Sequence, residues 1–89
     1  MFDVRKDSEY LSEHIQQAYN TPLDYLNDHL ARFPKEETFY VHCAGGYRSM
    51  IACSLLKANG IHNIKNVYGG YNKIKETNVP IAIPQSENA

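Results

Sequence analysis

The sequence predicts an α/β domain whose open, mostly parallel sheet is flanked by helices. Apolar segments typical of strands alternate along the chain with segments whose apolar residues recur at helical spacing. The run from Thr38 to Cys43 is almost continuously apolar or aromatic, as expected for a parallel strand that is buried on both faces. The 89 residues suffice for one domain with a modest core, and we expect this domain to span residues 1–83.

The first elements are predicted from a short apolar run and a helix-start signal. Phe2-Asp3-Val4 suggests a buried strand without any lead-in, so we expect the chain to be shortened at its N-terminus. Asp7 or Ser8 is suited to cap a short helix that runs to Glu13.

A second helix is expected to start at Thr21-Pro22, where a capping hydroxyl precedes a proline at the first helical position, and to end before Pro34. Its apolar residues lie three or four positions apart and form one stripe toward the core: Leu23, Leu26, Leu30 and Phe33.

A third helix is expected from about Arg48 to Asn59, with Gly60 as its left-handed C-terminal cap. We expect it to bury a wide apolar face made of Ile51, Ala52, Leu55, Leu56 and Ala58.

The remaining elements complete the alternation of strands and helices. Ile64 to Tyr68 predicts a strand, Gly69-Gly70 a turn, and Tyr71 to Glu76 a short helix. The polar tail, residues 84–89, is expected to be disordered.

Cys43 is the candidate catalytic residue because a strand ends there and a helix starts just beyond it. Unpaired N–H groups and partial positive charge at a helix start favour the thiolate over the thiol, and ligands of parallel sheets bind at this edge. Gly45 and Gly46 let successive amides curl around an anion, and Arg48 adds a positive charge. Tyr47 is expected to line the pocket. The candidate substrate-binding loop is Ala44, Gly45, Gly46, Tyr47, Arg48 and Ser49.

Composition argues against several other classes of function. A net charge of -1 and a pI of about 6.4 leave no basic surface for a nucleic acid. No apolar run is long enough to span a bilayer. Two cysteines without zinc-type spacing suggest free thiols in a reducing compartment, so we expect a cytoplasmic location. We expect no cofactor, and no metal because His14, His29 and His62 are scattered.

Four further side chains have structural interpretations. Asp3 and Arg5 are expected to form a strand-end pair of the weak surface kind, which orders neighbouring loops without contacting substrate. His42 precedes Cys43 on a strand, so its side chain should point to the opposite face and cannot act as the base for Cys43. Cys53 is expected to be buried as a small apolar residue.

The spacing between Cys43 and Arg48 distinguishes two chemistries. Cysteine-dependent phosphatases carry His-Cys, five residues and then Arg, whereas four residues separate Cys43 from Arg48 here. The loop should therefore be too tight for a tetrahedral phosphoryl group, although a single sulfur atom would fit. This shorter loop resembles that of the rhodanese family of sulfurtransferases, whose loop cysteine carries a transferable sulfur as a persulfide.

The resemblance to rhodaneses extends over nearly the whole chain. Asp3-Val4-Arg5 is similar to the Asp-Val-Arg strand of the family, and Gly69-Gly70-Tyr71 to its late turn. The stretch 46–52 most resembles rhodanese domains fused to metallo-β-lactamase-fold hydrolases of the persulfide-dioxygenase type. Glu13 and Ile74 stand where the family usually has glycine and tryptophan. Spaced residues between the first strand and the loop also match: Glu9, His14, Ile15, Ala18, Asn20 and Pro22.

The resemblance implies a three-layer rhodanese-like fold that lacks the N-terminal strand and helix usual in the family. It also implies that Cys43 takes a sulfane sulfur from thiosulfate or a low-molecular-weight persulfide and passes it to a thiophilic acceptor. A metallo-β-lactamase-fold hydrolase, fused or associated, is the partner that it suggests. Two alternatives stay open: a non-catalytic sulfur-binding or docking module, and a phosphatase or arsenate reductase of the same fold. Arg48 is equally suited to bind the donor and to pin the loop.

Overall fold

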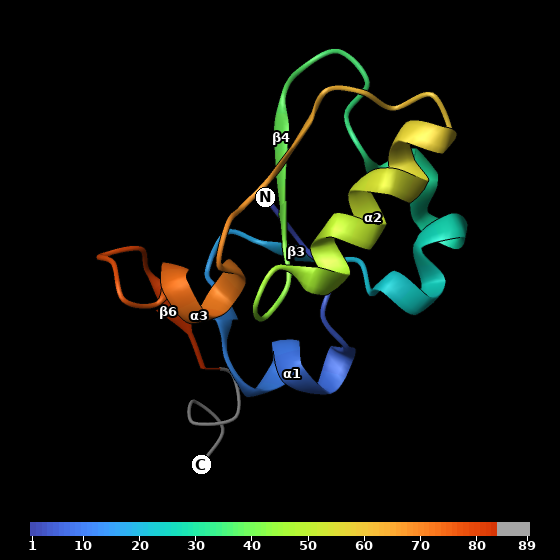
Figure 1. Cartoon of the computed structure of the whole chain (residues 1–89). Coiled ribbons are helices and arrows are strands. Elements are labelled where there is room, and N and C mark those ends of the chain that lie inside the picture. The colour runs from blue at the N-terminus through green and yellow to red at the C-terminus, as the bar shows by residue number, and fades with distance from the viewer. Residues whose placement is uncertain (84–89) are drawn as a thin grey trace.

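The computed structural model describes residues 1–83, which are built around one parallel sheet (Figure 1). The tail that we expected to be disordered, residues 84–89, lies outside the described residues. In chain order the elements are β1 (Phe2–Asp3), α1 (Asp7–Ser12), β2 (His14–Ile15), β3 (Tyr19–Asn20), the 3-10 helix η1 (Leu23–Arg32), β4 (Phe39–His42), α2 (Tyr47–Ala58), β5 (Ile64–Asn66), α3 (Gly70–Ile74) and β6 (Ile81–Ala82).

The main sheet has the strand order β3-β1-β4-β5, and each neighbouring pair of strands is parallel. This confirms the predicted α/β class, and it places β4, the strand that leads to Cys43, in the interior of the sheet. The strands β2 and β6 pair separately in an antiparallel ladder that the sequence did not predict. Strands of two residues are too short to show a periodic pattern.

Helices cover both faces of the main sheet. On one face, Phe2, Phe39 and Val41 belong to the larger apolar cluster, which also contains residues of α2 and η1. A second cluster packs Ile15 of β2 against residues of α3. Figure 1 shows α2 and η1 on one side of β4 and α3 on the other. The expected three-layer arrangement is therefore present.

The buried face of α2 differs in part from the prediction. Ala52 and Leu56 are buried as expected, whereas the other predicted members are exposed: Ile51, Leu55 and Ala58. The buried set is Ser49, Ala52, Cys53 and Leu56, which share one face at helical spacing. Ser49 lies on this buried face where α2 starts, and its hydroxyl contacts the Cys43 thiol.

The segment after Pro22 is not the regular α-helix that we predicted. It is a 3-10 helix, interrupted by non-helical dihedral angles at Tyr25 and His29. The residues that lead into this helix are attached to the sheet, because the Thr21 N–H donates to the Asp3 carbonyl at 2.9 Å. The Thr21 hydroxyl caps nothing and is buried without a hydrogen-bond partner in the described structure. The predicted apolar stripe still faces the core: Leu26 and Phe33 are buried, and Leu23 and Leu30 pack against the larger cluster.

Smaller corrections concern element ends. The N-cap of α1 is Lys6, whose N–H donates to Glu9 Oε1 at 3.2 Å, so Asp7 and Ser8 lie inside the first turn. Tyr40 is an exception to the predicted burial of β4, with 47% of its surface exposed. Gly60 adopts the expected left-handed conformation after α2, with φ 83°.

Candidate active site

The Cys43 thiol lies at the carboxyl end of an interior strand. The residue follows β4 directly, is only 1% exposed and belongs to the same apolar cluster as Val41. The preceding His42 is fully buried, and its Nε2 lies 3.4 Å from Asp3 Oδ2. Strand alternation therefore directs the imidazole and the thiol to different environments, as expected, and His42 is not the base for Cys43.

Two groups of the loop contact the sulfur. The Gly46 N–H donates to Cys43 Sγ at 3.1 Å, and Ser49 Oγ lies 3.6 Å from Sγ. The Ser49 hydroxyl is itself positioned by donating to the Gly46 carbonyl at 3.1 Å. Gly46 has a φ of 112°, a left-handed conformation that L side chains rarely adopt. Gly46 and Ser49 thus form a small polar cradle for one sulfur atom.

The cradle favours the thiolate. Burial alone would raise the pKa of the Cys43 thiol, but the Ser49 hydroxyl and the amides of Ser49, Gly46 and Arg48 outweigh it. The pKa of Cys43 therefore lies below its ordinary value. Cys53 is buried in α2 without such donors, and burial raises the pKa of its thiol. The two thiols are thus shifted in opposite directions.

We expect single-thiol variants to reveal this difference in pKa. In Cys53→Ser, the remaining Cys43 should ionise below the ordinary thiol pKa, because hydrogen-bond donors stabilise its anion. In Cys43→Ser, the remaining Cys53 should ionise above it. The measurement is thiolate ultraviolet absorbance followed against pH, which does not require a reagent to reach a buried sulfur. Coincident titration midpoints would contradict an activated Cys43.

Arg48 contacts α1. Its Nη1 lies 2.6 Å from Glu9 Oε1 and its Nη2 lies 3.0 Å from Glu9 Oε2, so the pair is bidentate. Both side chains are about one-third exposed, at 31% and 34%. Hydrogen bonding to Arg48 also lowers the pKa of Glu9. Of the two roles expected for Arg48, binding the donor or pinning the loop, this contact favours the second, since the guanidinium already has an anionic partner.

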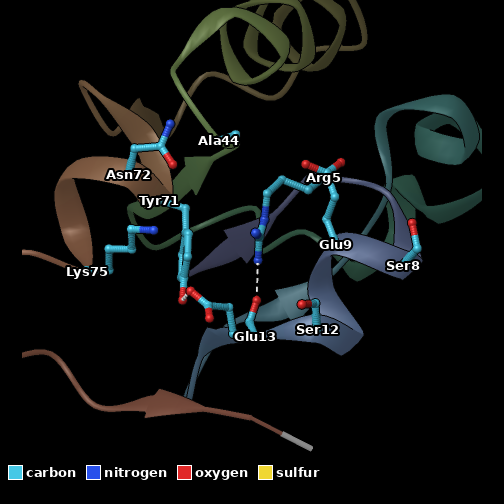
Figure 2. A pocket seen from close by; sticks show the side chains of 9 residues that line it. All are labelled: Arg5, Ser8, Glu9, Ser12, Glu13, Ala44, Tyr71, Asn72 and Lys75. Carbon is cyan, nitrogen blue, oxygen red and sulfur yellow. Dashed lines mark hydrogen bonds between the residues drawn. The ribbon is translucent and has the colours of Figure 1, made fainter. Parts of the chain in front are cut away.

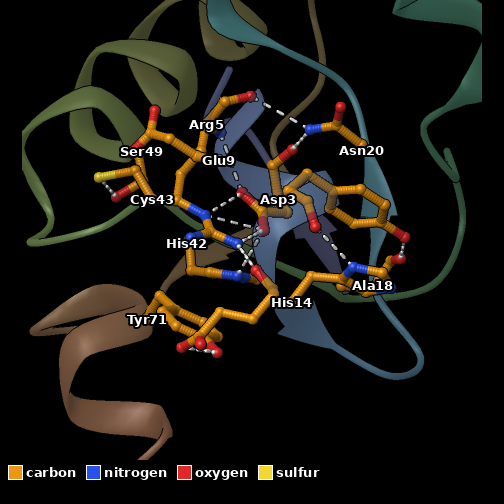
Figure 3. A network of polar contacts seen from close by, with 12 residues as sticks. Asp3, Arg5, Glu9, His14, Ala18, Asn20, His42, Cys43, Ser49 and Tyr71 are labelled. Atoms are coloured by element: carbon orange, nitrogen blue, oxygen red, sulfur yellow. Dashed lines mark hydrogen bonds and ion pairs between the residues drawn. The ribbon is translucent and has the colours of Figure 1, made fainter. Parts of the chain in front are cut away.

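Asp3 and Arg5 form a buried network and not the surface pair that we expected (Figure 3). Arg5 Nη2 donates to Asp3 Oδ2 at 2.8 Å and to the Glu13 carbonyl at 2.8 Å. Burial would raise the pKa of Asp3, but contacts with His42 and Arg5 outweigh it and lower the pKa to about 2. An ionised Asp3 therefore holds Arg5 between the end of β1 and the end of α1.

The loop is also supported from α3, a contact that sequence reasoning missed. The Tyr71 N–H donates to the Cys43 carbonyl at 2.6 Å, and the Asn72 N–H donates to the Ala44 carbonyl at 3.0 Å. The close packing of α3 against the loop requires glycine at position 70, where an added Cβ would lie 2.7 Å from the Ala44 carbonyl oxygen. The Gly69-Gly70 pair was visible in the sequence, but its position against the loop was not.

A cleft of about 400 Å³ opens beside Ala44, the first residue after the thiol (Figure 2). Its walls come from Arg5, from α1 and the residue that follows it, and from α3 and its C-terminal end. Tyr47, expected to line the pocket, is 73% exposed and does not line this cleft. Within residues 1–83, no three side chains of His, Cys, Asp or Glu gather as a metal site. The helices described there are also too short or too polar to cross a membrane.

Comparison with known proteins identifies the family. The family model described as a Rhodanese-like domain matches residues 1–77 of the chain. The chain belongs to the rhodanese-like domain family. Because the structural alignment agrees, the fold is also that of this family: a rhodanese-like domain from Staphylococcus aureus is 43% identical, with a TM-score of 0.73 over 78% of this chain and 67% of that one.

Curated relatives of this rhodanese-like domain are longer than it. The chain is 33% identical over 73 residues to YqhL of Bacillus subtilis, an uncharacterised protein, covering 82% of this chain and 58% of that protein. It is 29% identical over 89 residues to a tRNA uridine(34) hydroxylase of Yersinia pestis, covering 89% of this chain and 25% of that protein. The rhodanese-like domain thus corresponds to one part of each of these relatives.

Proposed function

We propose that this rhodanese-like domain is a sulfurtransferase that uses Cys43 as its sulfur carrier. The observation that carries the proposal is the cradle of Gly46 and Ser49 around a thiol whose pKa is lowered. A thiolate is a strong nucleophile toward sulfane sulfur, and the loop amides that favour the thiolate also suit the anionic persulfide that results. The family supports this class of reaction.

The reaction has two half-reactions. In the first, the Cys43 thiolate attacks the sulfane sulfur of the donor, the S–S bond of the donor breaks, and its remaining part leaves with the electron pair. Thiosulfate would thus release sulfite, and a persulfide R–S–SH would release the thiolate R–S⁻. In the second, a nucleophilic acceptor attacks the outer sulfur of the Cys43 persulfide and regenerates the thiolate.

Phosphatase chemistry is the less suitable alternative. A phosphoryl transition state spreads charge over three equatorial oxygens and needs several converging donors. The Gly46 N–H donates to Cys43 Sγ, and the amides of Ser49 and Arg48 also favour its thiolate, whereas the Arg48 guanidinium is engaged by Glu9. These contacts suit a single bound sulfur atom better than a tetrahedral oxyanion.

The proposal is tested by supplying thiosulfate or glutathione persulfide and following intact mass. We expect a gain of one sulfur atom per chain, lost again on cyanide treatment with formation of thiocyanate. An aryl phosphate should not be hydrolysed. Absence of sulfur loading from both donors, or phosphatase activity that depends on Cys43, would overturn the sulfurtransferase proposal.

Glu9 and Arg48 act in this proposal as one positioning unit for the loop. We expect Glu9→Gln and Arg48→Gln to slow sulfur loading by a similar factor, about fivefold, because each breaks the same bidentate pair. The double variant should be no slower than either single variant. Loading rates at low donor concentration check this. A much larger effect of Arg48→Gln than of Glu9→Gln would instead indicate that Arg48 contacts the donor.

The proposed partner rests on the sequence resemblance, and the proposed compartment rests on the cysteines. The stretch 46–52 resembles rhodanese domains fused to metallo-β-lactamase-fold hydrolases, so such a hydrolase is the proposed partner, fused or associated. A cytoplasmic location is proposed because Cys43 must remain a free thiol, and both cysteines are free in the structure.

A further inference from the structure

The cleft beside Ala44 contains four charged side chains, two of each sign. Arg5 and Lys75 are positive, and Glu9 and Glu13 are negative. Their charges cancel, so the cleft as a whole does not favour a dianion over a neutral or zwitterionic ligand. Which ligand it favours depends on the charges that lack a partner of opposite sign.

Two of the four charges are already neutralised by neighbours. Arg5 is paired with buried Asp3, and Glu9 is paired with Arg48. Within residues 1–83, the structure shows no ion pair for Glu13 or for Lys75. The cleft therefore presents one anion and one cation to a ligand.

Tyr71 lies next to both of these charged side chains. Its ring is buried, with Arg5 Cζ 4.3 Å and Lys75 Nζ 5.7 Å from the ring centroid, and Figure 2 shows the ring between the two cations. The Tyr71 hydroxyl donates to Glu13 Oε1 at 2.7 Å. Burial, followed by the bond to Glu13, raises the pKa of Tyr71 to about 12, so the hydroxyl remains a donor at neutral pH. Glu13 and Lys75 thus flank one rigid side chain.

We propose that Glu13 and Lys75 select a zwitterionic, amino-acid-type persulfide as the sulfur donor, with the donor ammonium at Glu13 and its carboxylate at Lys75. This inference rests on the proposed sulfurtransferase function. Thiosulfate lacks an ammonium and would bring two negative charges toward the Glu13 carboxylate. A volume of about 400 Å³ is ample for a donor the size of cysteine persulfide.

The chemical step is the one already described for a persulfide donor. The Cys43 thiolate takes the terminal sulfur of R–S–SH, the S–S bond of the donor breaks, and R–S⁻ leaves and is protonated by solvent. Glu13 and Lys75 take no part in bond making. They determine which R group is held next to the loop.

The test compares four donors on the Cys53→Ser background: cysteine persulfide, N-acetylcysteine persulfide, cysteamine persulfide and thiosulfate. The second lacks the ammonium and the third lacks the carboxylate. We expect cysteine persulfide to load Cys43 about tenfold faster than either, as is typical of one lost hydrogen bond to a charged group. The readout is the second-order rate constant of persulfide formation, measured by intact mass.

Two variants test whether Glu13 and Lys75 cause the preference for cysteine persulfide. Glu13→Gln keeps an acceptor for the Tyr71 hydroxyl but removes the charge, and it should reduce the preference for cysteine persulfide over N-acetylcysteine persulfide about tenfold. Lys75→Gln should reduce the preference for cysteine persulfide over cysteamine persulfide by a similar factor. Lys73→Gln is the matched control, because Lys73 is close in sequence and exposed, pairs with Glu76 and does not line the cleft.

The outcomes separate this inference from the proposed function. Sulfur loading with donor preferences that neither variant changes would overturn the inference and leave the sulfurtransferase proposal intact. Faster loading from thiosulfate than from cysteine persulfide in the wild-type chain would also overturn the inference and leave the sulfurtransferase proposal intact. Loading from none of the four donors, and none from glutathione persulfide, would overturn both.

Discussion

Replacing Cys43 by serine is expected to abolish sulfur transfer, with a loss of about 10³-fold or more in rate. The serine hydroxyl stays protonated at neutral pH and is a poor nucleophile toward sulfur. Serine also matches cysteine in size, so the packing of this buried position should be largely kept. The measurement is thiocyanate formation from thiosulfate and cyanide, together with the gain of sulfur mass on the isolated chain.

Cys53→Ser is the matched control for this experiment. Cys53 is the other cysteine of the chain, it is buried in α2 and burial raises the pKa of its thiol. We expect Cys53→Ser to transfer sulfur at close to the wild-type rate. Wild-type transfer by Cys43→Ser, or a sulfur label that maps to Cys53, would show that the carrier was assigned to the wrong residue.

Gly70→Ala is expected to have the largest effect on stability and to disable the loop as well. Gly70 has a φ of 57°, which costs about 1–2 kcal/mol for a residue with a Cβ. The added Cβ would also collide with backbone atoms of Cys43 and Ala44, including the Ala44 carbonyl oxygen at 2.7 Å. Together with overpacking of about 1–3 kcal/mol, the expected loss is about 3 kcal/mol. For a chain of this size that lowers Tm by roughly 12–24 °C.

Gly60→Ala separates the two causes of that loss. Gly60 also has a left-handed conformation, with φ 83°, but an added Cβ there would meet nothing within 4 Å. Its loss should be limited to about 1–2 kcal/mol, with sulfur loading retained. Urea unfolding and sulfur loading of both variants are the measurements. Equal losses of stability would mean that α3 does not pack tightly against the backbone of Cys43 and Ala44.

The local structure around Cys43 was predictable because it depends on residues that are close in the chain. A buried strand that stops at Cys43, two glycines and a helix that starts at the next residues are all defined by neighbours in the chain. The same holds for Gly60, whose left-handed conformation is a property of one backbone position. Steric limits on single residues and short periodic patterns leave clear traces in a sequence.

The partners of the loop were not predictable in the same way. Arg48 could bind a donor or pin the loop, and its bond to Glu9 joins residues 39 positions apart. The Tyr71 hydroxyl reaches Glu13 across 58 positions. Asp3 and Arg5 have the composition of a surface pair, but they are buried because β1 lies between β3 and β4 and Arg5 reaches the Glu13 carbonyl that follows α1. Such contacts depend on how elements pack, which a single sequence does not encode in any local pattern.

The sequence by itself therefore determined the α/β class, the position of Cys43 at the end of an interior strand and the short loop of four residues before Arg48. Only the tertiary structure decided which face of α2 is buried, because that depends on which side of the helix packs into the apolar cluster with β4 and η1. It also decided which charges of the cleft stay unpaired, since ion pairing depends on distances between elements that are far apart in the chain.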